Sequence, residues 1–153
     1  MFTLPPLALL LFSAPAHAFG LGTSIAFSDY GYWTYAPTLD LIFEPVTVQI
    51  HLVETLDDAF HNDLYLGANV QVRVVEKEIT KGLYGVAEPG GALWINGDPT
   101  RVSLAANLRL GAEAGEAVRA GLFVVPYLGL AIEDGETDVF AAGGLQFAVS
   151  FAL

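Results

Sequence analysis

Alternation of apolar residues with small or polar ones, at a period of two, runs through almost the whole chain after residue 18. A β-strand points successive side chains to opposite faces, whereas a helix returns to the same face every 3.6 residues and would mix the two sets. The pattern therefore predicts long strands with one apolar face. In the C-terminal segment that face carries Val139, Ala141, Gly143, Leu145, Phe147, Val149, Phe151 and Leu153.

Eight segments alternate in this way. We expect tight turns near residues 44–45, 76–78 and 113–116, and more polar, mostly longer connections at 57–61, 89–100 and 133–138. An even strand number, with tight turns at one end and longer loops at the other, is typical of an outer-membrane barrel. The predicted fold class is all-β: an eight-stranded antiparallel up-and-down transmembrane β-barrel. Its strands are expected at residues 19–28, 32–44, 46–54, 62–75, 79–88, 101–112, 118–132 and 139–153.

Composition indicates which face of the barrel meets lipid. Soluble exteriors are rich in Lys and Glu, but this chain has only six Lys and Arg residues together and is 54% hydrophobic. The less apolar face is rich in Gly, Ala, Ser, Thr, Asn and Gln, which suits a narrow interior. We therefore expect the apolar face outside, against lipid. A soluble lipocalin-like binder, with the apolar face inside, is the alternative.

Residues 1–18 are predicted to be a secretory signal peptide, and residues 19–153 the barrel. Residues 7–12 form an apolar core, and Ala16-His17-Ala18 is a small-x-small cleavage site, although no Lys or Arg precedes the core. The net charge is −11, which makes nucleic acid an unsuitable partner because phosphate binding needs clustered bases. The absence of Cys excludes disulfides and thiolate metal sites.

The strict alternation of the last segment runs through Phe147, Phe151 and Leu153. Here the chain resembles the small eight-stranded outer-membrane barrels of Gram-negative bacteria, such as the outer membrane protein A transmembrane domain and the OmpX-like proteins. In that family the last strand is the recognition signal for barrel assembly and usually ends in Phe or Trp. The resemblance therefore implies that Phe147, Phe151 and Leu153 form this signal, with Leu in the last position, and that the protein is a monomer in the bacterial outer membrane. Its implied partners are outer-membrane lipid, lipopolysaccharide and, during biogenesis, the barrel-assembly machinery.

Two aromatic residues, Trp33 and Tyr35, have lipid-side parity at the loop end of their strand. Amphipathic rings are favoured at the headgroup level of a bilayer. We therefore predict that these two residues belong to an aromatic girdle.

Five charged residues have inward parity and lie towards the tight-turn end. A buried charge is very costly without a partner. The sequence therefore predicts an ion-pair plug in the lumen, and a gated proton or ion path is the alternative. The predicted plug consists of Asp40, Glu44, Arg73, Arg109 and Arg119.

One histidine, His51, also has inward parity. Outer-membrane enzymes that modify lipid A have similar barrels and use a His and Ser dyad, but no Ser lies close to His51 on its strand. Ser103 and Ser150 are the other candidate partners. We interpret His51 as a hydrogen-bonded lumen residue, and keep a lipid-modifying enzyme as an alternative function.

The loop end is expected to be acidic, with ten of the seventeen acids, Glu88 among them. A candidate site for weakly bound divalent cations consists of Asp57, Asp58, His61 and Asp63. No other cofactor is expected. The predicted function is that of a non-enzymatic outer-membrane barrel with a filled lumen and a structural or surface-interaction role. The alternatives are a lipid-modifying enzyme, a narrow pore and a soluble lipocalin-like binder.

Overall fold

The computed structural model of the protein describes residues 18–29, 31, 33–55, 64–97 and 100–153. The signal peptide and the candidate cation site at 57–63 lie outside these residues, apart from Ala18. Within them no helix is long and apolar enough to cross a membrane. The described strands are β1 (Ala18–Ser28), β2 (Trp33–Phe43), β3 (Val46–Thr55), β4 (Leu64–Val72), β5 (Val75–Thr80), β6 (Leu83–Gly97), β7 (Thr100–Gly115), β8 (Val118–Glu133) and β9 (Glu136–Ala152).

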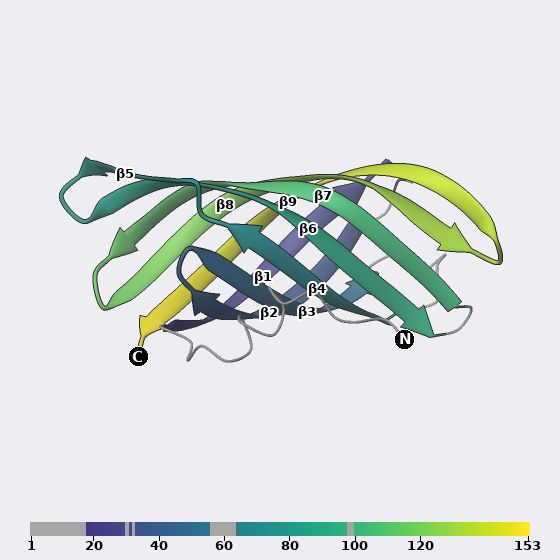
Figure 1. Cartoon of the computed structure of the whole chain (residues 1–153), viewed down its shortest axis with the longest axis horizontal. Helices are drawn as coiled ribbons and strands as arrows, with labels where there is room; N and C mark the ends of the chain where they lie inside the picture. Colours follow the sequence, from purple (N-terminus) through teal and green to yellow (C-terminus); the bar gives the residue numbers. More distant parts are fainter. Residues whose placement is uncertain (1–17, 30, 32, 56–63, 98–99) are drawn as a thin grey trace, which may run out of the picture.

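The strands form a closed antiparallel barrel, drawn from the side in Figure 1. The sheet order is β4-β3-β2-β1-β9-β8-β7-β6-β5, and a further pairing between β4 and β6 closes it. β5 pairs only with β6 and continues the line of β4 after Arg73 and Val74. β4 and β5 therefore occupy one position around the circumference, and the nine strands form an eight-stranded barrel. The β5–β6 hairpin extends past the closed part at the tight-turn end (Figure 1).

Side-chain exposure shows that the apolar face is outside, as the sequence predicted. On neighbouring residues of β8, Leu122 is 62% exposed and Phe123 is 1% exposed; on β9, Leu145 is 59% and Gln146 is 2% exposed. Such a continuous apolar exterior fits lipid and not water. The soluble lipocalin-like alternative, which needs the opposite arrangement, is therefore wrong.

The predicted boundaries between residues 76 and 100 are wrong. Residues 76–78 lie in β5 and not in a turn, and the tight turn comes at Lys81-Gly82, where Gly82 has a φ of 74°. β6 runs on to Gly97 through residues that were expected to form a loop.

Pro89 and Gly90 misled the sequence interpretation, because both residues usually interrupt strands. Pro89 lies opposite the break between β4 and β5, where β6 has no ladder partner on that side. A Cβ on Gly90 would lie 2.3 Å from the carbonyl oxygen of Val70, so glycine permits the close approach that closes the barrel.

Small residues of the inner face make room for large ones on neighbouring strands. Phe123 is buried beside Gly111 of β7, where an added Cβ would lie 2.7 Å from its ring and 2.1 Å from the carbonyl oxygen of Leu122. The glycine-rich inner face is thus a packing requirement of a narrow lumen.

Candidate functional site

The tight-turn half of the lumen holds a network of ion pairs centred on Arg73. Its Nε donates to Glu88 at 2.7 Å, and its Nη2 donates to Glu113 at 2.8 Å. Its Nη1 donates to Glu76 at 2.8 Å. One guanidinium therefore links carboxylates from β5, β6 and β7. These are charge-assisted hydrogen bonds, the strong class.

Two further arginines complete the network. Arg109 donates to the second oxygen of Glu88, and its guanidinium carbon lies 3.4 Å from the ring centroid of Phe123. Arg119 Nη1 lies 3.2 Å from Glu76 Oε1 and 3.6 Å from Glu113 Oε2. Three arginines thus face three glutamates, so the network carries no net charge.

The acids of this network differ from those that the sequence predicted. Asp40 is buried in the lumen and accepts a hydrogen bond from Gln49 Nε2 at 2.8 Å, but within the described ranges it forms no ion pair with an arginine. Glu44 is exposed in the turn between β2 and β3.

The misplaced boundaries explain why Glu88 and Glu113 were missed. Residue 88 was expected next to a loop and residue 113 in a turn, but both lie within strands at inward positions. Parity could have found Glu113, because it is four residues from Arg109 on the same face.

A layer of amides lies above the ion pairs. Asn107 Nδ2 donates to Asn69 Oδ1 at 2.7 Å, and Gln71 Nε2 lies 3.5 Å from Asn107 Oδ1. Gln146, also buried, has an Nε2 atom without a hydrogen-bond partner among the described residues. This layer separates the charged half of the lumen from the half near the loops.

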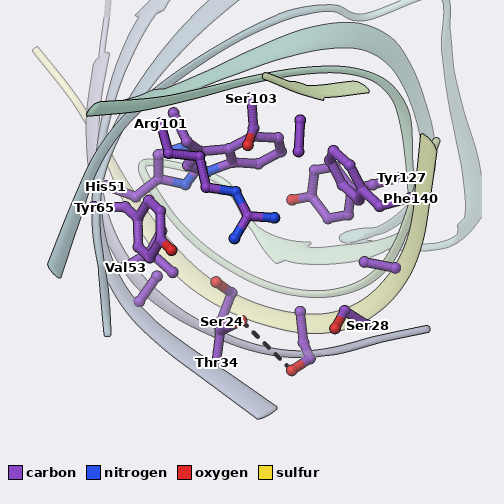
Figure 2. Close-up of a pocket in the computed structure, with 15 residues that line it drawn as sticks. Ser24, Ser28, Thr34, His51, Val53, Tyr65, Arg101, Ser103, Tyr127 and Phe140 are labelled. Atoms are coloured by element: carbon purple, nitrogen blue, oxygen red, sulfur yellow. Dashed lines mark hydrogen bonds between the residues drawn. The ribbon is translucent and has the colours of Figure 1, made fainter. Parts of the chain in front are cut away.

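The loop half contains a cavity of about 120 Å³. Figure 2 shows its side chains pointing into the ring of strands, with the Arg101 guanidinium near the centre. Trp94 forms an aromatic cluster there: its ring centroid lies 5.5 Å from that of Tyr127, 6.2 Å from Phe140 and 5.9 Å from His51.

The polar groups of the cavity are mainly hydroxyls. Thr34 Oγ1 lies 3.5 Å from the carbonyl oxygen of Ala26 (Figure 2), and Ser28 Oγ is buried without a partner among the described residues. Arg101 Nε lies 3.6 Å from Glu133. The cavity lining is Ser24, Ala26, Ser28, Thr34, Ala36, His51, Val53, Tyr65, Trp94, Arg101, Ser103, Tyr127, Ala131, Phe140 and Ala142.

His51 is buried in the lumen, where the sequence placed it. Its Nε2 atom is buried without a partner among the described residues. Ser103 lines the same cavity, yet it is not bonded to this nitrogen, and Ser150 lies beside the ion-pair network at the opposite end. The structure therefore brings no His and Ser dyad together at Nε2.

Aromatic residues occupy both ends of the outer face. Trp33 and Tyr35 point outwards near the loops, and Trp33 lies 5.0 Å from Phe27 between ring centroids. At the other end, Phe19 stacks on Phe151 with centroids 5.2 Å apart. The two rows lie eight positions apart on β1, roughly 20 Å along the axis of a tilted barrel.

On β9, Phe147 is exposed on the outer face, and Leu153 follows the end of the strand with 77% exposure.

In the part of the chain that the structure describes, no three His, Asp or Glu side chains are arranged to hold a metal ion.

Solved structures with the same architecture were found. Neisserial surface protein A (NspA) superposes with a TM-score of 0.63 at 6% sequence identity, over 89% of this chain and 96% of that one. The N-terminal β-barrel domain of Pseudomonas aeruginosa OprF gives a TM-score of 0.54 at 14% identity, over 90% of this chain and all of that one. The chain has the fold of a small membrane barrel. At these identities the likeness concerns the fold alone.

Searches by sequence found nothing similar: no family model and no curated protein matches the chain. The resemblance expected from the alternation thus holds for the architecture of the barrel. The function of this protein has to be argued from the side chains of its own barrel.

Proposed function

We propose that the protein is a non-enzymatic outer-membrane barrel with a structural or surface-interaction role and no continuous pore. The ion-pair network carries this proposal. Glu88 and Arg109 have side chains that are 0% and 4% exposed, and with Arg73 they bridge neighbouring strands inside the lumen. An eight-stranded barrel is just wide enough for side chains to fill it, so such a network suffices to block it.

The location follows from the exterior. A band of Val, Leu, Ile and Phe between two aromatic rows matches the lipid-facing surface of outer-membrane barrels. The predicted signal peptide supports export. The protein should sediment with outer membranes and require detergent for release. Recovery as a soluble monomer from the periplasm would contradict this location.

Conductance in planar bilayers tests the block. The reconstituted wild type should give no current steps. The double change Glu88→Ala with Arg109→Ala removes two buried, oppositely charged side chains and should give steps. Steps from the wild type would favour the narrow pore instead.

The proposed partners are membrane components. Lipopolysaccharide would contact the acidic loop end through bridging divalent cations, and the outward aromatic residues of β9 would serve the assembly machinery. Phe147→Ser should then slow assembly into the outer membrane more than Gln146→Ser, its inward neighbour. Equal assembly rates would contradict the role of Phe147.

A further inference from the structure

The β5–β6 hairpin extends past the closed barrel at the tight-turn end (Figure 1), and its two faces differ in chemistry. The inner face carries Glu76, which pairs with Arg73 at 2.8 Å. The outer face carries Val75, Lys77 and Ile79, because neighbouring residues of a strand point to opposite sides. We propose that this outer face binds anionic phospholipids of the periplasmic leaflet.

The pairing of β5 with β6 shows which side chains face outwards. Glu76 lies opposite Val86, which is buried in the core of the lumen. Gly85, the next residue of β6, therefore faces outwards and lies opposite Lys77. A Cβ added at Gly85 would lie 3.4 Å from Cδ1 of Ile79. The Ile79 side chain thus covers the outer surface of β6, and Lys77 leaves β5 on that same side.

The apolar exterior of the barrel continues onto this hairpin. Val75 and Ile79 are both exposed, and so is Leu110 on β7. Val75 pairs with Ala87 of β6, which in turn pairs with Leu110, so the apolar surface runs across three strands without a break. Large exposed apolar side chains that adjoin a lipid-facing surface are favoured in lipid over water. The lipid that covers Leu110 therefore extends over the hairpin.

The positive charge of the hairpin selects the kind of lipid. The chain has only two lysines, Lys77 and Lys81, against 17 acids, and both lie here. Both side chains are exposed, and within the described ranges neither forms an ion pair. A lysine lays its methylene stem along apolar residues while its ammonium group stays at the headgroups. With Val75 and Ile79 on either side, Lys77 directs its ammonium group to lipid phosphates.

The two lysines are not equivalent. Gly115 N donates to the carbonyl oxygen of Gly82 at 3.0 Å, which brings the turn containing Glu116 beside Lys81. That carboxylate offsets part of the charge of Lys81, so Lys77 is the main headgroup ligand. The short turns of outer-membrane barrels face the periplasm and the longer loops face outwards. The leaflet at this end is therefore the periplasmic one.

Quenching by brominated lipids tests the proposal with the full barrel in vesicles. Trp33→Phe with Trp94→Phe removes both native tryptophans, and Ile79→Trp places a single one on the hairpin. Phosphatidylglycerol and phosphatidylcholine with the same brominated acyl chains are the probes, and the ratio of their quenching gives the local lipid preference. In the matched control Trp33 is the only tryptophan, on the outer face at the loop end.

Both lipids should quench the tryptophan of Ile79→Trp, and phosphatidylglycerol should be preferred by about fivefold at low salt. Adding Lys77→Gln should remove most of this preference, and Lys81→Gln should reduce it less. Higher salt should weaken it, because headgroup attraction is screened. At Trp33, phosphatidylglycerol should have no advantage.

Three results would overturn the proposal: no quenching of the Ile79→Trp variant, no preference for phosphatidylglycerol there, or an undiminished preference after Lys77→Gln. Absent quenching together with dimers on native electrophoresis would mean that a second copy covers β5 instead. If the tryptophan replacements prevent folding, a fluorophore on Ile79→Cys gives the same ratio with nitroxide-labelled forms of the two lipids, because the chain has no other Cys.

Discussion

The two halves of the lumen share one inward-facing pattern but differ in what fills them. Near the tight turns, long charged side chains meet across the lumen and exclude space. Near the loops, Ser24, Ala26, Ser28 and Ala36 occupy the corresponding inward positions of β1 and β2 and leave a cavity. Parity decides which side chains enter a barrel. Their volume decides whether the barrel is closed or hollow.

The stabilisation also differs between the halves. Glu88 and Glu113, the buried glutamates of the charged half, each contact two arginines, so the loss of either would leave guanidinium groups uncompensated in a confined space. The loop half contains neutral hydroxyls beside a cavity. We therefore expect substitutions of similar size to have unequal effects at the two ends.

The largest difference should come from Glu88→Ala. It leaves Arg73 and Arg109 without a shared buried partner, and breaking such a pair typically costs about 3–5 kcal/mol. Ser103→Ala, in the other half, should cost less than about 0.5 kcal/mol. Guanidinium titration in phospholipid vesicles measures both free energies of unfolding.

Replacing Glu88 and Arg109 together by Leu tests the origin of that effect. Exchange of a buried ion pair for apolar side chains is often nearly neutral. The double change should therefore cost less than the sum of the two single changes. Simple additivity would mean that the two residues do not interact.

The next largest effect concerns the outer face. Leu145→Arg should cost about 2–4 kcal/mol, because a charge on the lipid face must enter hydrocarbon. Gln146→Ser, on the adjacent inward position, should cost about 1 kcal/mol or less, since the Gln146 Nε2 atom has no hydrogen-bond partner among the described residues. The same titration checks both variants, and the reverse ranking would mean an apolar interior.

Particular residues explain which parts of the fold could be predicted from the sequence. Strict alternation predicted the faces of β8 and β9, because each step along a strand reverses the side chain whatever the turn chemistry. The strand boundaries between Glu76 and Gly97 were predicted wrongly, because the residues at 89–91, a proline and two glycines, have the composition of a loop. Their place in a strand depends on close approach to β4, which is a contact between segments distant in sequence.

The acids that pair with the arginines were predicted wrongly for the same reason. A shift of strand boundaries reassigns an acid from the rim to the lumen, as happened with Glu88. The cavity was not predictable either, because alternation reports on orientation and carries no information about the space left between opposing walls. That space depends on which strands face each other across the lumen.

A smaller effect should distinguish the packing of the two halves. Gly111→Ala places a Cβ 2.1 Å from a carbonyl oxygen of the filled wall and should cost about 1–3 kcal/mol, as overpacking usually does. Ala142→Val, in the cavity wall, should change stability by less than about 0.5 kcal/mol because space is present. Equal costs would show that the cavity collapses in solution.

The smallest effect should come from acid titration of the hairpin that extends from the charged half. β5 pairs with β6 alone, so Glu76 lies beyond the closed part of the barrel. The hydrogen bond from Arg73 lowers the pKa of Glu76 below its usual value, with Arg119 adding to the effect. Because this pKa is lower in the folded state than in the unfolded one, the carboxylate contributes stability above its unfolded pKa. That contribution is lost as the pH falls through the folded value.

Glu76→Gln should therefore reduce the acid-side slope of stability against pH, while leaving stability near neutral pH only slightly lower, because the group is partly exposed. Glu78→Gln makes the same charge change on the same strand at a carboxylate that accepts a hydrogen bond from Gly82 N. It should flatten the slope less. Unfolding titrations between pH 3 and pH 7, with all three proteins in the same vesicles, provide the measurement. If the two variants give the same slope, the pairing of Glu76 with Arg73 does not contribute, and the charged half would owe its stability to Glu88 and Glu113 alone.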